Sequence, residues 1–273
     1  MGKTLAIFLA VGLLAARARA ERIELKRGGV SCTVETCGAR VVSYCVRGRE
    51  LLWMPGAGPK DDGCWRHGGI AVAWPWFGRL GEGDRRIHGY AWKSDFSVAE
   101  RSASSVRLVL SGESADLEYA IRLDGSLELE LKTRSKSGFE LPLGVAFHPY
   151  FRVGERDAAL VAGFGDGLVA VSNAVDRSVH FGSAQSRHLC ILRDNARNVA
   201  LHVVSEGATG LNLWNPGREK RCPSAIPGDE WRYFIAIEPF AMGVNRFLVL
   251  DPGEEHVLRM AVFPEESLSD EKK

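Results

Sequence analysis

The sequence predicts an all-β fold, a single domain built as a sandwich of antiparallel strands. Apolar and polar residues alternate with a period of two in many short segments, which is the pattern of half-buried strands. Turn-forming residues separate these segments, and the chain of 273 residues holds 30 glycines and 11 prolines. No long segment shows the spacing of an amphipathic helix.

The clearest element is a hairpin centred on Asp124-Gly125. Alternating apolar residues precede this pair at Leu117–Leu123 and follow it at Leu127–Leu131. An Asp-Gly pair between two such runs favours a tight hairpin turn. Further strands are predicted, in chain order, at Cys32–Glu35, Arg40–Val46, Val106–Leu110, Val169–Val171, Ala200–Val204, Gly210–Trp214, Tyr233–Ile237 and Val257–Val262.

The first twenty residues resemble a targeting segment. Lys3 supplies a basic start, Leu5–Ala16 is an unbroken apolar run, and Ala18-Arg19-Ala20 gives a small-x-small cleavage pattern. The run is too short to span a bilayer. We therefore expect a signal peptide at 1–20, a sandwich domain at 21–267 and a flexible tail at 268–273, in a secreted, periplasmic or endomembrane protein. The alternative is a cytoplasmic protein with an apolar tail.

The charge balance gives no support to a nucleic-acid partner, because the net charge is only +1. We expect no stable association with a membrane. The sequence leaves the oligomeric state open and is compatible with a monomer.

Six cysteines form an even set: Cys32, Cys37, Cys45, Cys64, Cys190 and Cys222. An oxidising compartment would permit disulfides, with fifteen possible complete pairings, and free buried thiols are an equal alternative. The chain has no CxxC pair, which argues against a zinc ribbon or a thioredoxin-like site.

The segment Cys64–Ala91 combines aromatic and basic residues, which is typical of a carbohydrate site because sugars stack on rings and need hydrogen-bond partners. A tryptophan-rich core edge beside a solvated basic loop would give the same composition. Its aromatic members are Trp65, Trp74, Trp76, Phe77 and Tyr90, and its basic members are Arg66, His67, Arg79, Arg85, Arg86 and His88.

Two polar residues interrupt apolar, strand-like segments. His148 lies in Phe147–Phe151 and Glu238 lies in Ile235–Pro239. A charge in an apolar strand costs free energy unless it is paired or useful, so the two residues suggest an acid/base pair. Each alone has an ordinary structural reading, a satisfied core histidine and an exposed strand end.

An ordered set of motifs resembles the aldose 1-epimerase (mutarotase) superfamily, most closely its hexose-6-phosphate mutarotase branch. The set comprises Gly68-Gly69-Ile70, Trp74-Pro75-Trp76-Phe77-Gly78, His88-Gly89-Tyr90-Ala91, Phe147-His148-Pro149-Tyr150-Phe151, Asp176-Arg177, Trp214-Asn215-Pro216-Gly217 and Ile237-Glu238-Pro239. The resemblance implies a galactose mutarotase-like β-supersandwich, a sugar substrate, and neither a metal nor an organic cofactor.

The resemblance also implies roles for individual residues. His148 and Glu238 match the catalytic pair, His88 a histidine that faces the substrate, and Asp176 an acidic residue near the sugar. His67 and Trp92 stand where the phosphate-binding branch has arginines, so a phosphate site would need Arg66, Arg79, Arg85 or Arg86, or would be absent. Trp76 and Asn215 complete the candidate substrate-binding set, although Asn215 could bond locally in a turn, and Asp176-Arg177 could be a surface ion pair.

Mutarotation requires removal of the anomeric hydroxyl proton and protonation of the ring oxygen. We expect Glu238 to act as the base and His148 as the acid, with the roles exchanged when the ring closes. Apolar neighbours should raise the pKa of Glu238, and a nearby carboxylate should keep His148 protonated near neutral pH. We expect His148 at a strand end, because Pro149 cannot donate to a ladder, and both side chains in one cleft, a sugar ring's width apart.

Two other functions fit the sequence less well. A non-catalytic carbohydrate-binding protein on the same fold would not need a matched acid and base. A polysaccharide lyase or glycosidase would need a clear second carboxylate, and we find none.

Overall fold

The computed structural model describes residues 20–56, 64–65, 67–81, 87–165, 167–171, 174–181, 187–218, 226–243 and 247–265. All of the expected signal peptide except Ala20, and the whole expected tail at 268–273, lie outside these ranges.

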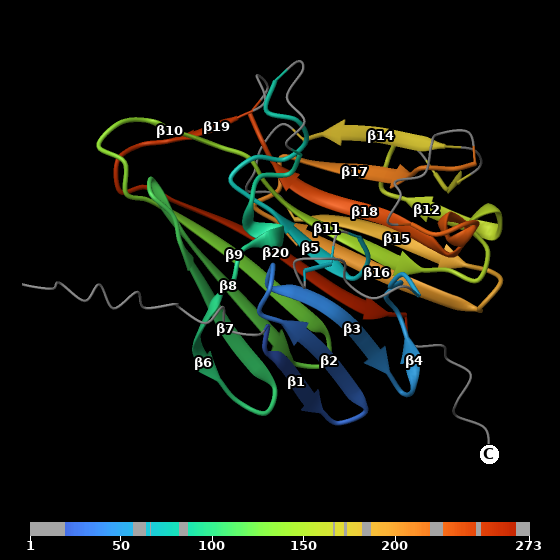
Figure 1. Cartoon of the computed structure of the whole chain (residues 1–273). Helices are drawn as coiled ribbons and strands as arrows, with labels where there is room; N and C mark the ends of the chain where they lie inside the picture. The colour runs from blue at the N-terminus through green and yellow to red at the C-terminus, as the bar shows by residue number, and fades with distance from the viewer. Residues whose placement is uncertain are drawn as a thin grey trace, which may run out of the picture.

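Two nine-stranded sheets stack face to face, and every pairing between named strands is antiparallel (Figure 1). The order in the first sheet is β1 (Arg22–Arg27), β2 (Val30–Glu35), β3 (Arg40–Val46), β5 (Ile70–Ala73), β11 (Val145–Arg152), β18 (Phe234–Ala241), β17 (Gly210–Asn215) and β14 (Val175–His180), and β4 (Arg49–Glu50) pairs with β3. The all-β prediction is confirmed.

The order in the second sheet is β13 (Val169–Ala170), β12 (Ala159–Ala162), β15 (His188–Asp194), β16 (Val199–Glu206), β20 (Glu255–Pro264), β9 (Leu127–Ser135), β8 (Ala115–Leu123), β7 (Ser105–Ser111) and β6 (Ser97–Arg101). A separate ribbon joins β10 (Leu141–Leu143) to β19 (Leu248–Leu250). The described helical residues form three short 3-10 helices, η1 (Ala91–Lys93), η2 (Arg156–Ala158) and η3 (Glu230–Tyr233).

The predicted hairpin is confirmed as β8 and β9. Leu123 pairs with Leu127, so the turn holds the three residues from Asp124 to Ser126. Gly125 has a φ of 74°, which falls in the left-handed region where glycine carries no steric penalty. All eight other predicted strands also occur, with ends that shift by a few residues.

One hydrophobic core lies between the two sheets. Its buried residues come from alternate positions of the first sheet, such as Phe147 and Ile237, and of the second, such as Tyr119 and Leu129. Phe147 of β11 and Tyr119 of β8 meet across the core, with ring centroids 5.9 Å apart. Because side chains alternate between the two faces, the remaining residues of each sheet point away from this core.

Two features of the described residues bear on earlier expectations. No helix among them is long and apolar enough to cross a membrane. Within the same residues, no group of three or more histidine, cysteine, aspartate or glutamate side chains could hold a metal ion.

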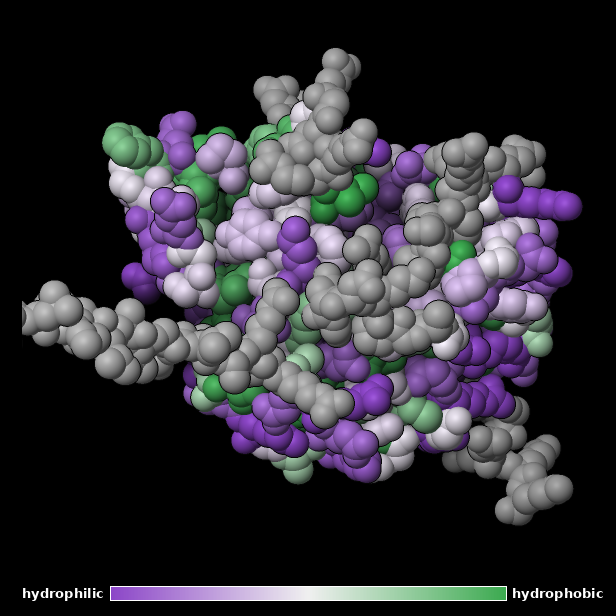
Figure 2. Space-filling model, viewed as in Figure 1, coloured by the Kyte–Doolittle hydropathy of each residue, from purple (hydrophilic) through white to green (hydrophobic). Residues whose placement is uncertain are grey.

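Exposed apolar side chains occur at the ribbon of β10 and β19, at the upper left of Figure 1. Phe139 is 83% exposed and Val249 is 55% exposed. Figure 2 shows hydrophobic residues at this same end of an otherwise largely hydrophilic face.

The packing between the sheets gives a first prediction. Phe147→Ala should reduce the free energy of unfolding by about 3–5 kcal/mol, because it removes a fully buried ring and leaves a cavity. Urea unfolding followed by tryptophan fluorescence would measure the change. The matched control is Phe139→Ala, which should change stability by less than about 0.5 kcal/mol because that ring is exposed. Equal losses in the two variants would contradict the assignment of the core.

Candidate active site

His148 and Glu238 lie opposite each other on the two central strands β11 and β18. The register that pairs Ala146 with Phe240 and Tyr150 with Ala236 places them on the same face, away from the core. His148 Nε2 lies 3.3 Å from Glu238 Oε1. The expectation of a shared face is confirmed, but the expected separation of a sugar ring is wrong, because adjacent strands bring the side chains into direct contact.

His148 lies in the middle of β11 and not at a strand end, so that expectation is also wrong. Pro149 and Pro239 follow the histidine and the glutamate, and neither can donate a backbone hydrogen bond. The ladder between β11 and β18 accordingly skips residues 147–149, while both strands continue beyond the gap. The sheet therefore tolerates the two prolines by interrupting its hydrogen bonds beside the pair.

The pair belongs to a row of residues that crosses the first sheet. Ala71 of β5 pairs with His148, Asn212 of β17 pairs with Glu238, and Ser178 of β14 pairs with Asn212. Paired residues on neighbouring antiparallel strands point to the same face, so the row forms one strip that is polar from His148 to Ser178.

Two small apolar clusters flank this strip on the same face. One consists of Trp53, Tyr150, Ile226, Trp231 and Phe234, with Trp214 packed against it. The other consists of Ala73, Ala146 and Phe240, with Phe77 and Met242 packed against it. Polar groups between two apolar walls suit a ligand with hydroxyls on its edge and C–H groups on its faces.

Burial controls the protonation of the pair. Glu238 is 1% exposed, and burial raises its pKa well above the usual value, with a further increase from Asp176 and a decrease from a hydrogen bond donated by Asn212. The expected increase is therefore present, and it comes mainly from burial.

The expectation that a carboxylate keeps His148 protonated is wrong. Burial lowers the pKa of His148 well below its usual value, and repulsion from Arg40 and from the protonated forms of His88 and His67 lowers it further. The two shifts have opposite directions, and each favours the uncharged form of its group: the protonated carboxyl of Glu238 and the neutral imidazole of His148.

Asn212 orients Glu238, and the sequence analysis missed it. Its Oδ1 accepts a hydrogen bond from Ser178 Oγ at 2.8 Å, which turns its amide nitrogen toward two carboxylates. Nδ2 lies 3.5 Å from Glu238 Oε2 and 3.4 Å from Asp176 Oδ1. The alternation of Gly210–Trp214 in the sequence indicates that the Asn212 side chain lies on the same face as that of Trp214.

Asp176 lies close to the pair, as expected. Its side chain is exposed on β14 and reaches Glu238 through Asn212. Its neighbour Arg177 donates to the backbone oxygen of Phe164 at 2.7 Å, so that arginine is held elsewhere.

His67 reaches the site through Tyr150. Its Nδ1 lies 2.8 Å from the hydroxyl of Tyr150, whose ring stacks on His148 at 4.8 Å with an interplanar angle of 16°. Burial raises the pKa of Tyr150, so the phenol keeps its proton and can donate to His67. Tyr150 is a second residue that the sequence analysis did not single out.

His88 packs edge-on against His148, with ring centroids 5.2 Å apart. It has a φ of 61°, and its Nδ1 accepts a hydrogen bond from the backbone of Gly78 at 3.1 Å. Burial lowers the pKa of His88 to about 4, so the ring is neutral at pH 7. The structure thus brings His88, His148, Glu238, Asp176 and His67 together.

Comparison with known proteins identifies the family of this chain. The sequence profile described as aldose 1-epimerase matches residues 21–174, more than half of the chain. The chain belongs to the aldose 1-epimerase family.

Individual relatives are distant. A protein of Escherichia coli (strain K12), whose name proposes glucose-6-phosphate 1-epimerase activity, is 25% identical over 228 residues, covering 74% of this chain and 76% of the relative. Among solved structures, a Salmonella typhimurium protein whose name proposes a mutarotase matches with a TM-score of 0.78 at 20% identity, covering 91% of each chain. A galactose mutarotase related enzyme from Lactobacillus acidophilus matches with a TM-score of 0.71 at 16% identity, covering 93% of this chain and all of its own.

These structures show that the fold is the galactose mutarotase-like sandwich, as expected. Several members of the expected substrate-binding set are nevertheless found in contact with other residues. Asn215 is fully buried, accepts bonds from Arg156 and Gly217, and donates to the carbonyls of Trp231 and Phe234. These local hydrogen bonds agree with the turn alternative for Asn215, and Asn212 is the asparagine that contacts Glu238.

The two tryptophans of that set also contact other residues. Trp76 packs edge-on against Tyr90 at 6.2 Å, and Trp92 lies in η1, where its backbone approaches Gly38 closely. Arg79 is exposed and pairs with Ile87 in a single bridge. The other proposed phosphate arginines, Arg66, Arg85 and Arg86, lie outside the described residues.

The cysteines divide between the two alternatives. Cys37 and Cys64 form a disulfide with Cα atoms 5.5 Å apart. Cys32, Cys45 and Cys190 are free thiols, and Cys222 lies outside the described residues.

A groove of about 250 Å³ lies on the outer face of the second sheet, on the opposite side of the sandwich from the pair. Charged residues that pair with one another line it, as in the contacts of Arg259 with Glu130 at 2.7 Å and of Arg187 with Glu206 at 3.7 Å. We do not assign the reaction to this groove, because its ionisable groups neutralise one another.

The neutral state of His88 predicts how stability depends on pH. Its folded pKa of about 4 lies below the unfolded value of about 6.5, so the unfolded chain binds a proton first as the pH falls. Stability from this residue is complete above about pH 6.5 and is lost as the pH falls toward 4.

His88→Asn removes this titration and keeps a residue that tolerates a positive φ. Between pH 7 and pH 4.5 the wild type should lose about 1–2 kcal/mol more stability than the variant, allowing for partial exposure of the ring. Urea unfolding at the two pH values measures this difference, and equal losses would contradict the neutral assignment.

Proposed function

We propose that the protein is an active mutarotase, which interconverts the α and β anomers of a hexose or hexose 6-phosphate. One observation carries the proposal: a buried acid and a buried base lie 3.3 Å apart between two apolar clusters, and they retain hydrogen-bonding capacity that the protein does not fill. Among the described residues, His148 Nδ1 has no hydrogen-bond partner, and Glu238 Oε1 has none apart from its 3.3 Å contact with His148 Nε2. Buried polar atoms without partners are costly, so a ligand that bonds to them stabilises the site.

Ring opening uses both partners of the pair. Glu238 takes the proton of the anomeric hydroxyl while His148 gives a proton to the ring oxygen, so the C1–O5 bond breaks and a carbonyl forms at C1. Rotation about C1–C2 then exposes the other face of the carbonyl. Closure returns the protons in the opposite sense and yields the other anomer.

The protonation of the free site corresponds to the open-chain stage of this cycle. After ring opening Glu238 holds a proton and His148 is neutral, which is the state that burial favours in the free protein. Opening begins from the other state, in which the proton lies on His148. The 3.3 Å contact allows the proton to cross, and hydrogen bonds from Asn212 and a sugar hydroxyl would stabilise the carboxylate.

Catalysis then follows from a difference in binding. The buried pair stabilises the open-chain intermediate more than the cyclic sugar, and this lowers the barrier between the anomers. His88, Asp176 and Trp214 lie beside the pair and are the side chains that we assign to substrate contact.

The substrate is proposed as a hexose, free or phosphorylated. The names of the curated relatives favour the phosphate. His67 and Trp92 at the expected arginine positions favour a free sugar, because neither offers the paired donors of a guanidinium.

We also propose that the protein is exported. The apolar N-terminal segment supports this, and the Cys37–Cys64 disulfide would persist in an oxidising compartment. Location in the cytoplasm is the alternative, and sugar phosphates would then be available as substrates.

The catalytic roles predict the outcome of polarimetry on freshly dissolved α-glucose and on the α-enriched form of glucose 6-phosphate. The wild type should accelerate mutarotation of at least one of the two. Glu238→Gln and His148→Asn should each lower kcat by about 10²–10⁴-fold, because each removes one proton-transfer group.

Glu130→Gln is the matched control, since Glu130 pairs with Arg259 on the other sheet, and its kcat should equal that of the wild type. Acceleration by neither sugar nor any other aldose would overturn the proposal. Sugar binding without acceleration would instead favour the non-catalytic carbohydrate-binding protein.

A further inference from the structure

A buried arginine that the reaction does not use lies in the same row as the catalytic pair. Arg40 of β3 is only 1% exposed. Val41 pairs with Ile70 of β5, and one further step of this register places Arg40 opposite Ala71, which pairs with His148. Arg40 therefore lies two strands from His148 on the same face, with Ala71 on the strand between them.

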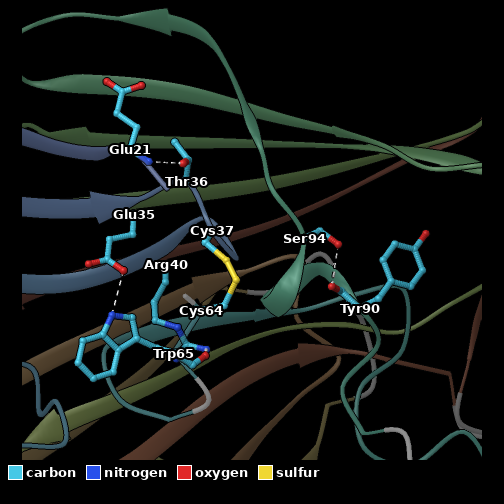
Figure 3. Close-up of a disulfide and its surroundings, with 9 residues drawn as sticks. All are labelled: Glu21, Glu35, Thr36, Cys37, Arg40, Cys64, Trp65, Tyr90 and Ser94. Atoms are coloured by element: carbon cyan, nitrogen blue, oxygen red, sulfur yellow. Dashed lines mark hydrogen bonds between the residues drawn. A yellow bond between two sulfur atoms is a disulfide. The ribbon is translucent and has the colours of Figure 1, made fainter. Parts of the chain in front are cut away.

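Arg40 holds the backbone on both sides of His67. Its guanidinium donates to the carbonyl of Gly68 at 2.6 Å and to the carbonyl of Trp65 at 2.8 Å. The segment is fixed at further points, because Cys64 is bonded to Cys37 and the Trp65 indole donates to Glu35 at 2.9 Å. Figure 3 shows Arg40 beside the disulfide and Trp65.

The segment ends in a tight approach to the sheet. Gly69 has a φ of 63°, and a Cβ there would lie 2.2 Å from the carbonyl oxygen of Val41. No residue other than glycine fits this position without a shift of the backbone. The described neighbours of His67, Trp65 on one side and Gly68 on the other, are thus anchored to β3 by Arg40.

His67 connects this anchored segment to His148 through Tyr150. Its ring meets the Tyr150 hydroxyl at 2.8 Å, and Tyr150 stacks on His148. A series of contacts therefore runs from Arg40 through His67 and Tyr150 to the imidazole of His148.

The charge of Arg40 has no carboxylate within 4 Å among the described residues, although Glu35 lies near enough to interact. Burial lowers its pKa to about 10, so it is still a cation at neutral pH. A buried cation without a contacting counterion is costly, which argues that it has a function.

The titratable and charged groups around His148 come from every neighbouring element. They are Arg40 on β3, His67 before β5, His88 after β5, Tyr150 on β11, Glu238 on β18 and Asp176 on β14. Within this set Arg40 carries the permanent positive charge, and it disfavours a second one on the imidazole.

We propose that Arg40 is a positioning residue for the reaction, which aligns His148 through His67 and Tyr150 and whose charge keeps the shared proton on Glu238. This inference rests on the proposed function. It assigns to Arg40 two separable effects, one on geometry and one on charge.

The test compares Arg40→Lys and Arg40→Gln, because each can keep one hydrogen bond to a carbonyl and only the lysine keeps the charge. The measurement is kcat for mutarotation as a function of pH. Both variants should have a lower plateau than the wild type. In Arg40→Gln the acid limb should also move to higher pH by about one unit, as expected for loss of a unit charge roughly 10 Å away at an effective dielectric constant of about 20.

A merely structural role of Arg40 would lower the kcat plateau and leave the acid limb of both variants at the wild-type pH. That result would overturn this inference and leave the proposed function intact. An inactive wild type would overturn the proposed function and this inference with it. If Arg40→Gln does not fold, Tyr150→Phe tests the same series of contacts with Arg40 intact. Its kcat should fall by about tenfold at constant KM, as for loss of a positioning contact, and an unchanged kcat would overturn the inference.

Discussion

The contact between His148 and Glu238 is the constraint on which the rest of the site depends. Adjacent strands in the middle of a sheet force the two side chains together, and the surrounding apolar clusters remove them from water. Neither group can then be charged alone without a large cost. The neighbouring residues reduce this cost. Asn212 and Ser178 orient the carboxylate on one side, and Tyr150, His67 and His88 surround the imidazole on the other.

The same burial connects stability to function. Two prolines break the ladder beside the pair, and a buried arginine without a contacting carboxylate lies two strands away. Each feature is unfavourable for a sheet taken by itself. In the proposed reaction each has a role, because the broken ladder accommodates the reacting residues and the arginine biases a proton that must cross 3.3 Å.

The sequence predicted the fold and the pair, because alternation with a period of two and a charge in an apolar strand are local signals. It could not predict the direct contact or the neutral imidazole. Both depend on β11 lying beside β18, although nearly ninety residues separate His148 from Glu238 in the chain. Asn215 was selected because its motif is conspicuous, whereas the contact of Asn212 with Glu238 depends on the pairing of β17 with β18. Arg40 gave no signal, because an arginine at the start of a strand is usually exposed.

The central claim is that burial places the shared proton on Glu238 in the free protein. The direct measurement is the ¹⁵N chemical shift of the His148 ring, followed from pH 5 to pH 9 without sugar and assigned by its absence in His148→Asn. A neutral imidazole at pH 7, with one protonated ring nitrogen, is the predicted result. An imidazolium with both nitrogens protonated at pH 7 would contradict the account.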